Sequence, residues 1–369
     1  EVRDKAPGWD FSAPRGGNFQ FAGVPIPEPE WVADRTKLFE ADRFAEAAAS
    51  NYDVASHFSA MDAEGIDLAV LFPSRGLLVP GVIDVDPSLI MLAAKAYNDW
   101  LADFCREGSQ RLFGIGMLDL RDIDAARAEA IRCVEELGFV GLFLRPNVVE
   151  GKPLFDPKYE PLWATIADLD VPVCFHEGAK VRVPQVGPME LGNRWAFWHV
   201  CTHPHAQQIA MVALVMGGVL ERHPSLRCAF LECGAGWLPY WMWRMDEHAE
   251  PRLWRYQSVG DVADLSLTPS EYVRRQCFVS IESDEEPGRH AVEALGGTNI
   301  VWASDYPHID STFPGAVDAF LGLGGISKEE KRCILSDNPA AMFGPQVRQA
   351  LQDLPAGRSN GIRPTGATE

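Results

Sequence analysis

The stretch Ile66-Asp-Leu-Ala-Val-Leu-Phe72 is a short apolar run that ends at Pro73-Ser74, and residues 88–104 follow it with apolar side chains at helical spacing. A short apolar run that stops at turn residues predicts a buried strand, and apolar spacing of three and four residues predicts an amphipathic helix. This strand-then-helix order sets the pattern of the chain, because it returns along most of its length.

Six more strands are expected, each an almost continuous apolar run: 111–118, 139–144, 171–175, 226–231, 277–281 and 299–303. Helices are expected between and after them at 123–137, 157–169, 206–222, 237–248, 287–295 and 314–322. Apolar strands separated by amphipathic helices are typical of a parallel sheet covered on both faces. We therefore predict an α/β fold, a (β/α)8 TIM barrel, of which seven units are visible.

The length of 369 residues, with 47% hydrophobic and 23% charged residues, suits one large globular barrel domain. We expect that domain to cover residues 1–350, beginning with an irregular Pro-, Gly- and Trp-rich arm at 1–35, and a flexible tail to cover 351–369. The longest apolar stretch, 209–220, is too short to span a bilayer.

The formal net charge is −19, which disfavours binding to nucleic acid or to an anionic membrane surface. The expected partner is a small molecule, and any positive charge that it needs must be local. The eight cysteines form no C-x-x-C pair and several lie inside apolar runs, so we expect reduced thiols in a cytoplasmic protein.

Two strand ends carry side chains that suit a metal ion. In a parallel barrel the reacting groups lie at the carboxyl ends of the strands, where His176 and Asp305 each follow an apolar run. An imidazole and a carboxylate form half of a site that favours zinc, with manganese as the second option. The alternatives are a histidine that caps its own loop and an aspartate that caps a helix.

Two neighbouring strands end in charged residues. Glu232 can act as a general acid or base, bind metal, or cap the helix that follows. Arg145, with Asn147 two residues later, can hold a substrate carboxylate in a bidentate contact. The alternative for Arg145 is a salt bridge to Glu177 or Glu232.

Two further histidines are candidates for contact with substrate. His203 belongs to the H-x-H sequence His203-Pro204-His205, and a helix predicted from Ala206 favours substrate contact over metal binding there. His308 follows the turn at Asp305-Tyr306-Pro307 and is expected to face the site.

Taken together, several stretches resemble the amidohydrolase-related family that contains 2-amino-3-carboxymuconate 6-semialdehyde decarboxylase and the resorcylate-type decarboxylases. They run in the family's order from about residue 60 to 345: 61–70, Gly138-Phe-Val-Gly-Leu-Phe-Leu-Arg-Pro-Asn147, 171–178, Met216-Gly-Gly-Val-Leu-Glu-Arg-His-Pro224, 230–246, 302–307 and Asp337-Asn-Pro-Ala-Ala-Met-Phe-Gly344.

The resemblance implies a (β/α)8 barrel with one divalent metal, commonly zinc. In the family the ion is held by an H-x-H or E-x-H on the first strand, a His on the fifth and an Asp on the last; His176 and Asp305 match the last two. Residues 1–62 contain no H-x-H, so we expect the first strand to lie upstream of Glu1. Glu232 stands where the decarboxylases carry a proton-transferring His, and it can replace that His only if burial raises its pKa.

These observations predict a metal-dependent hydrolase or decarboxylase that acts on a small carboxylated compound, with aromatic compounds among the options. Catalysis is assigned to Glu232 and Asp305, metal binding to His176 and Asp305, and substrate binding to Arg145, Asn147, His203 and His308. The alternative is an inactive or truncated barrel with a binding or scaffold role. The aromatic segment 237–245 indicates a homodimer contact.

Overall fold

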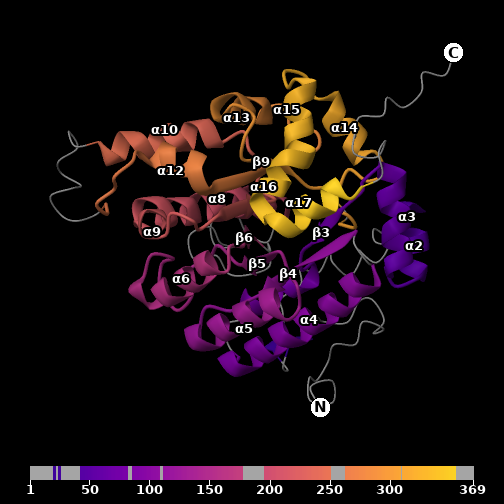
Figure 1. Ribbon diagram of the computed structural model, residues 1–369, viewed down its shortest axis with the longest axis horizontal. Helices are drawn as coiled ribbons and strands as arrows, with labels where there is room; N and C mark the ends of the chain where they lie inside the picture. The colour runs from indigo at the N-terminus through magenta and orange to yellow at the C-terminus, as the bar shows by residue number, and fades with distance from the viewer. Residues whose placement is uncertain are drawn as a thin grey trace.

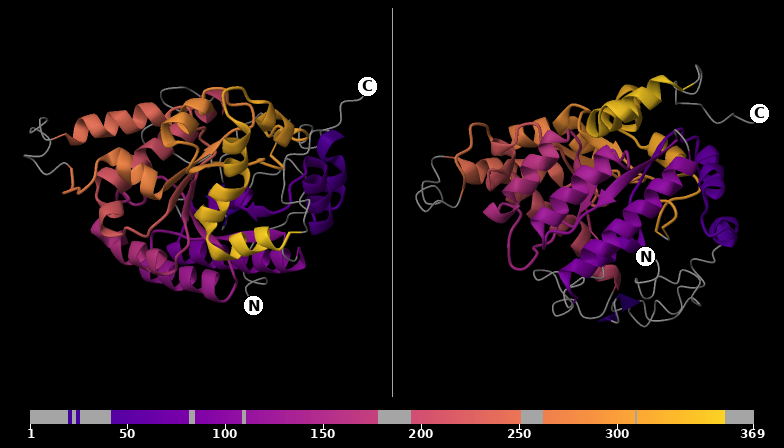
Figure 2. Two further views of the ribbon diagram at one scale, coloured as in Figure 1. Left: turned by 45° about the horizontal axis from the view of Figure 1, so that its top comes forward. Right: turned by 60° about the horizontal axis from the view of Figure 1, so that its bottom comes forward.

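The computed structural model describes residues 42–81, 85–108, 111–177, 195–250, 262–308 and 310–354, together with a two-stranded antiparallel pair formed by β1 (Gln20–Phe21) and β2 (Val24–Pro25). A parallel sheet runs through the centre, and helices lie around its outer side (Figures 1 and 2).

The sheet has seven strands in chain order, and every predicted strand is confirmed. They are β3 (Ala69–Leu71), β4 (Leu112–Met117), β5 (Gly141–Leu144), β6 (Val173–His176), β7 (Cys228–Leu231), β8 (Cys277–Ile281) and β9 (Ile300–Trp302). All residues of β5, β6, β7 and β8 are buried, which explains why these strands are apolar without alternation.

The helices that follow the strands are α4 (Pro87–Glu107), α5 (Ile123–Glu135), α6 (Glu160–Asp168), α8 (Trp195–Met216), α9 (Val219–Arg222), α10 (Leu238–Ala249), α13 (Gly288–Leu295) and α14 (Ala316–Gly322). One continuous core joins them to the sheet, and Trp163 of α6 and Phe143 of β5 are fully buried in it. Short turns of 3-10 helix lie at η2 (Asp42–Phe44), η3 (Arg75–Gly81) and η4 (Pro157–Tyr159).

The predicted helix at 206–222 differs from the structure at both ends. Helix α8 begins at Trp195 and contains Pro204, so His203 lies inside a helix and not before one. Pro204 removes one backbone donor, but the helix continues because Ala206, Ala210 and Met211 pack into the core. The helix ends before Gly218, whose φ of 77° is left-handed, and α9 follows.

Several short helices were not predicted: α2 (Ala45–Ala49), α3 (Val54–Glu64), α12 (Pro269–Gln276), α15 (Lys328–Arg332), α16 (Asn338–Phe343) and α17 (Pro345–Gln352), with a π turn, η6 (Cys333–Asp337), before α16. Helix α12 has a capping box from Thr268 and Glu271 that the sequence displays. Helix α17 extends past residue 351, where the tail was expected to begin; residues 355–369 and most of the predicted arm at 1–35 lie outside the described residues. The single barrel domain at 1–350 stays a prediction.

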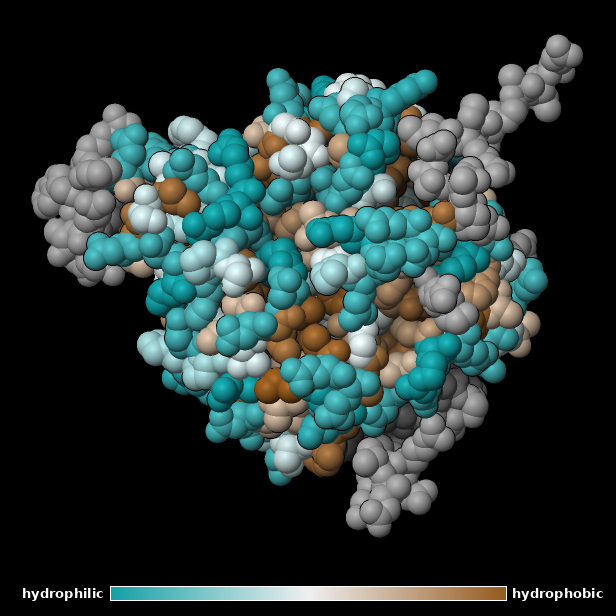
Figure 3. Space-filling view, in the orientation of Figure 1, coloured by the Kyte–Doolittle hydropathy of each residue, from teal (hydrophilic) through white to brown (hydrophobic). Residues whose placement is uncertain are grey.

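The two edge strands, β3 and β9, do not pair with each other within the described part of the chain. The residues of β3 are only half-buried. Figure 3 shows hydrophobic side chains gathered below α17, around β4, on a face that is otherwise mostly hydrophilic. The curled seven-stranded sheet matches the predicted barrel fold with one strand fewer. None of the seven strands carries an H-x-H.

All eight cysteines are free thiols, as the sequence predicts. Among the described helices, none combines the length and the apolar character that crossing a bilayer requires.

Candidate active site

A cavity of about 380 Å³ lies at the carboxyl ends of β7, β8 and β9, beside helix α8. Its acidic and histidine lining residues come from four segments of the chain: His199, His203, Glu232, Glu282, Asp284, Asp305 and Asp310. This is the end of the sheet at which the barrel fold places its reacting groups.

His176 is the last residue of β6, and it is buried between two acceptors. Its Nδ1 lies 2.8 Å from the backbone carbonyl of Glu177, and its Nε2 lies 3.1 Å from Oε2 of Glu232. Burial lowers the pKa of His176, which favours the neutral ring, and a neutral imidazole has only one N–H for these two contacts. With Nδ1–H donated to the carbonyl, the Nε2 lone pair faces a carboxylate, an arrangement that suits a cation between them.

Glu232 follows β7 and has a φ of 52°, an uncommon left-handed conformation that turns the chain away from the strand. Its backbone N–H donates to the Ser280 hydroxyl at 2.9 Å, which ties the turn to β8. Burial alone raises the pKa of Glu232. His176 would lower it if its ring were protonated, and the hydrogen bond and charge of His203 and the charge of His308 also lower it, so that the pKa lies below its ordinary value. Glu232 is therefore an ionised carboxylate at neutral pH, and the raised pKa that a proton donor requires is not found.

Asp305 follows β9 and also has a left-handed φ, of 54°. Its Oδ1 lies 2.8 Å from Nδ1 of His308. Burial raises the pKa of Asp305. Burial alone would lower the pKa of His308, but the hydrogen bond and charge of Asp305 outweigh it and raise that pKa to about 9. One ligand atom from each of Glu232, Asp305 and His308 lies within 4.8 Å of the others. The predicted ligands His176 and Asp305 are therefore both neighbours of Glu232: His176 contacts it, and the Asp305 carboxylate lies within 4.8 Å of it.

His203 reaches this cluster from α8. Gln207, one turn later, donates from Nε2 to the carbonyls of Phe175 (2.9 Å) and Leu231 (3.2 Å), the residues just before His176 and Glu232. This contact fixes α8 against the ends of β6 and β7 and places Nε2 of His203 3.6 Å from Oε2 of Glu232.

Arg145 and Asn147, at the end of β5, are engaged with Glu177. Arg145 is 4% exposed and forms an ion pair with Oε1 of Glu177, while the Asn147 amide donates to Oε2 at 2.7 Å. Arg145 also donates to the Leu77 carbonyl at 2.9 Å and to the Asn147 side chain at 3.0 Å. The salt bridge to Glu177 is the alternative that the sequence left open. Among the predicted site residues, His203, Glu232 and Asp305 line the cavity, whereas Arg145, Asn147, His176 and His308 do not.

Four acidic or histidine residues of the cavity were missed in the sequence: His199, Glu282, Asp284 and Asp310. Glu282 follows β8 as directly as Glu232 follows β7, so the strand-end rule could have found it; burial and the neighbouring carboxylates of Glu232 and Asp305 raise its pKa to about 8. His199 precedes His203 by one helical turn, a spacing that the misplaced helix start concealed. Asp310, whose Oδ2 lies 3.2 Å from Nε2 of His199, has no comparable signal.

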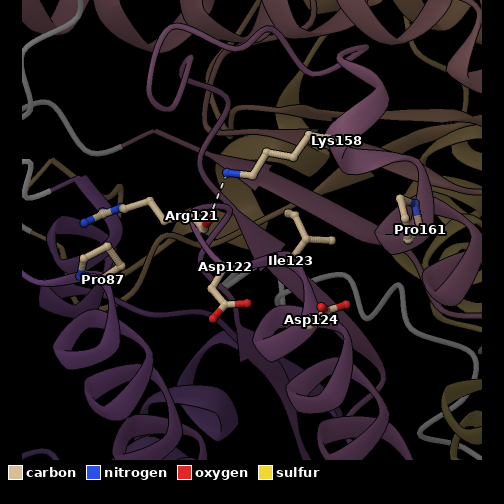
Figure 4. A pocket seen from close by; sticks show the side chains of 7 residues that line it. All are labelled: Pro87, Arg121, Asp122, Ile123, Asp124, Lys158 and Pro161. Atoms are coloured by element: carbon tan, nitrogen blue, oxygen red, sulfur yellow. Dashed lines mark hydrogen bonds between the residues drawn. The ribbon is translucent and has the colours of Figure 1, made fainter.

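A larger hollow of about 530 Å³ lies elsewhere, among the first turns of α4, α5 and η4 (Figure 4). Its polar groups serve the helix ends: Asp122 caps α5 through the Ala125 N–H at 3.0 Å, and Lys158 donates to the Arg121 carbonyl at 2.8 Å. We therefore place the candidate active site in the smaller cavity, where the titratable groups converge.

Comparison with known families identifies the class of protein. The profile of the family described as "Amidohydrolase" matches residues 47–344, most of the chain. The chain belongs to the amidohydrolase family, and it is an enzyme of that superfamily.

The more specific similarities are to decarboxylases. The chain is 30% identical over 302 residues to the gamma-resorcylate decarboxylase of Rhizobium radiobacter, with 76% of this chain and 84% of the relative covered. It is 26% identical over 254 residues to the 2-amino-3-carboxymuconate-6-semialdehyde decarboxylase of Dictyostelium discoideum, covering 68% and 66%.

Solved structures agree on the fold. The 2,6-dihydroxybenzoate decarboxylase from Rhizobium superposes with a TM-score of 0.62 at 25% identity, covering 78% of this chain and 87% of that one. A dihydroxybenzoic acid decarboxylase from Polaromonas, with bound manganese and the inhibitor 2-nitroresorcinol, gives a TM-score of 0.67 at 22% identity, covering 86% and 93%.

Proposed function

We propose that this protein is a metal-dependent decarboxylase of a small aromatic carboxylate. The observation that carries the proposal is the cluster at the ends of β6, β7 and β9: one ligand atom from each of Glu232, Asp305 and His308 lies within 4.8 Å of the others, and Glu232 also faces Nε2 of His176. The similarity to the gamma-resorcylate decarboxylases supports decarboxylation over hydrolysis.

In this proposal His176 and Asp305 hold the divalent cation, zinc or manganese. When bound there, such an ion polarises an oxygen of the substrate. His308 orients the Asp305 carboxylate through its 2.8 Å contact. Glu232, ionised and 3.1 Å from His176, adds negative charge that favours the cation.

Loss of CO2 leaves the bonding electron pair on a ring carbon, which must then accept a proton. We assign this proton to Glu282, which lines the cavity and is the carboxyl group there whose raised pKa, about 8, keeps it protonated at neutral pH. A cation nearby draws that pKa down toward neutrality, the range that suits a general acid. Asp305 thus keeps its proposed catalytic place, while Glu232 changes from proton donor to charged partner of the cation site.

The surroundings of Arg145 and Asn147 support a different role from substrate binding. Both hold the Glu177 side chain, and Glu177 in turn supplies the carbonyl that fixes the His176 ring. We propose that they position His176, and that the substrate contacts come from His203 and His308.

The test is turnover of 2,6-dihydroxybenzoate and a panel of other hydroxybenzoates by the full chain loaded with Zn²⁺ or Mn²⁺. Decarboxylation releases CO2 and, in D2O, places one deuterium on the ring carbon that lost it. Incorporation of ¹⁸O from labelled water into a product of C–O or C–N cleavage would support hydrolysis instead. A metal-loaded chain that turns over no member of either class would favour the binding or scaffold alternative.

We also propose a homodimer formed through α10. Tyr240 and Trp243 are 58% and 55% exposed on this helix and lie against each other, with ring centroids 5.7 Å apart. Trp237, by contrast, faces inward and donates its indole N–H to the Gly234 carbonyl at 2.8 Å. Light scattering should give twice the chain mass for the wild type and the single mass for Trp243→Ser; a monomeric wild type at micromolar concentration would contradict the proposal.

A further inference from the structure

Acidic side chains outnumber basic ones in the lining of the cavity. The lining carries the carboxyl groups of Glu232, Glu282, Asp284, Asp305 and Asp310, and none of its described residues is a lysine or an arginine. Arg145, the cation that the sequence offered, is paired with Glu177. A carboxylated substrate entering this cavity would meet more negative than positive charge, even with one divalent cation at His176 and Asp305.

Helix α8 presents a second set of metal-binding side chains to the cavity. His199 and His203 lie one turn apart on the same face of α8, with ring centroids 4.2 Å apart. Two histidines at this spacing can direct their nitrogens to one ion, as they do in helical zinc sites. Glu232 faces them, and one ligand atom from each of the three residues lies within 4.8 Å of the others.

Glu232 is also the link to the first site. Its Oε2 lies 3.1 Å from Nε2 of His176 and 3.6 Å from Nε2 of His203, so the same carboxylate reaches both sets of nitrogens. His203 is only 6% exposed, and Gln207 holds this part of α8 in place, so the donors are positioned in advance. Carboxylates shared between two ions about 3.5–4 Å apart are a common design in two-metal enzymes.

We propose that His199, His203 and Glu232 form a second divalent-cation site, which shares Glu232 with the site at His176 and Asp305, so that His203 contacts the substrate through the cation and not directly. The inference rests on the proposed function, because it explains how an acidic cavity accepts an anionic substrate. Three protein ligands leave a coordination position open, and an oxygen of the substrate carboxylate fits it by charge. Imidazole and carboxylate ligands suit Zn²⁺ and Mn²⁺ alike.

The test counts metal ions bound to the full chain after equilibrium dialysis against Zn²⁺ or Mn²⁺, by elemental analysis, with titration calorimetry for the affinities. The wild type should bind two equivalents. His199→Ala should bind one, with the affinity for the second equivalent lowered at least ~100-fold, because loss of a ligand costs more than loss of an outer partner. Asp305→Asn should also bind one, and Glu232→Gln should weaken both.

His205→Ala is the matched control, because His205 lies on the same helix but is exposed, and it should bind two equivalents. His199 is itself partly exposed, and unchanged circular dichroism and melting temperature will show that its variant is folded. One equivalent in the wild type, kept in His199→Ala and lost in Asp305→Asn, would overturn the second site and leave the proposed function standing. One equivalent that is lost only in His199→Ala would support the second site and contradict the His176–Asp305 assignment, and no bound metal would overturn both.

Discussion

Two clusters of charged side chains occupy the same end of the sheet, and they differ in how their charges are matched. At β5 and β6, both carboxylate oxygens of Glu177 meet a donor, from Arg145 and from Asn147. At β7, β8 and β9, the carboxylates of Glu232, Glu282 and Asp305 crowd one cavity, where Glu232 raises the pKa values of both Glu282 and Asp305. We call the first group, around Glu177, the complete cluster, and the second, formed by Glu232, Glu282 and Asp305, the incomplete cluster. A charged residue at a strand end is structural when its charge is fully paired, and it is a candidate for function when it is not.

The largest effect is expected from removing a ligand of the incomplete cluster. Asp305→Asn should lower the decarboxylation rate by roughly 10⁴-fold, because it removes the negative ligand whose cation supplies several kcal/mol of transition-state stabilisation. Its free energy of unfolding without metal should change little. Steady-state kinetics measures the rate, and urea unfolding measures the stability. The control is Asp103→Asn, which changes an exposed carboxylate on α4. Near-normal turnover by Asp305→Asn would show that the reaction does not depend on a cation held by Asp305.

The complete cluster should show the reverse pattern. Arg145→Ala leaves the carboxylate of Glu177 buried without its cation, which should cost about 3–5 kcal/mol of unfolding free energy. Arg106→Ala, which breaks an exposed pair with Asp103, should cost less than about 1 kcal/mol. If Arg145 instead bound the substrate, its variant would raise KM and leave the stability nearly unchanged.

The sequence predicted the sheet and pointed to part of the candidate site because both follow local rules. Apolar runs without alternation located all seven strands, and the strand-end rule then found His176, Glu232 and Asp305. The sequence could not predict which charges are matched, because the pairing of Arg145 with Glu177 joins residues 32 positions apart in the chain. His199 was missed for a local reason: Pro204 suggested a helix start, although core packing carries α8 through it.

The incomplete cluster should also respond to pH. The pKa of Glu282 is raised from 4.5 to about 8, so in metal-free protein its contribution to stability is full below pH 4.5 and is lost as the pH rises toward 8. Glu282→Gln has no such dependence and should gain about 1–3 kcal/mol on the wild type between pH 5 and pH 8. Denaturant unfolding at several pH values measures this difference. Parallel pH curves for the two proteins would show that Glu282 is ionised like an exposed glutamate.

The smallest effect is expected from a contact that supports the incomplete cluster from outside. Arg43, in η2, donates to the carbonyls of Ser311 (3.0 Å) and Phe313 (2.8 Å), and Phe44 stacks on Phe313 with ring centroids 5.8 Å apart. These contacts hold the segment that follows Asp305 against the indigo helices α2 and α3 (Figure 1).

Arg43→Ala should therefore weaken metal binding at His176 and Asp305 about 3- to 10-fold, since two hydrogen bonds to an exposed side chain are worth about 1 kcal/mol. The melting temperature should fall by only about 2 °C. Glu46→Gln, an exposed change on the neighbouring helix, controls for the charge of this surface. Glu177 is held by its own donors. We therefore expect Arg145→Ala to lower the unfolding free energy by the same amount in the wild type and in the Arg43→Ala background. A coupling between Arg43 and Arg145 above about 0.5 kcal/mol in that double-mutant cycle would mean that the two clusters are one unit.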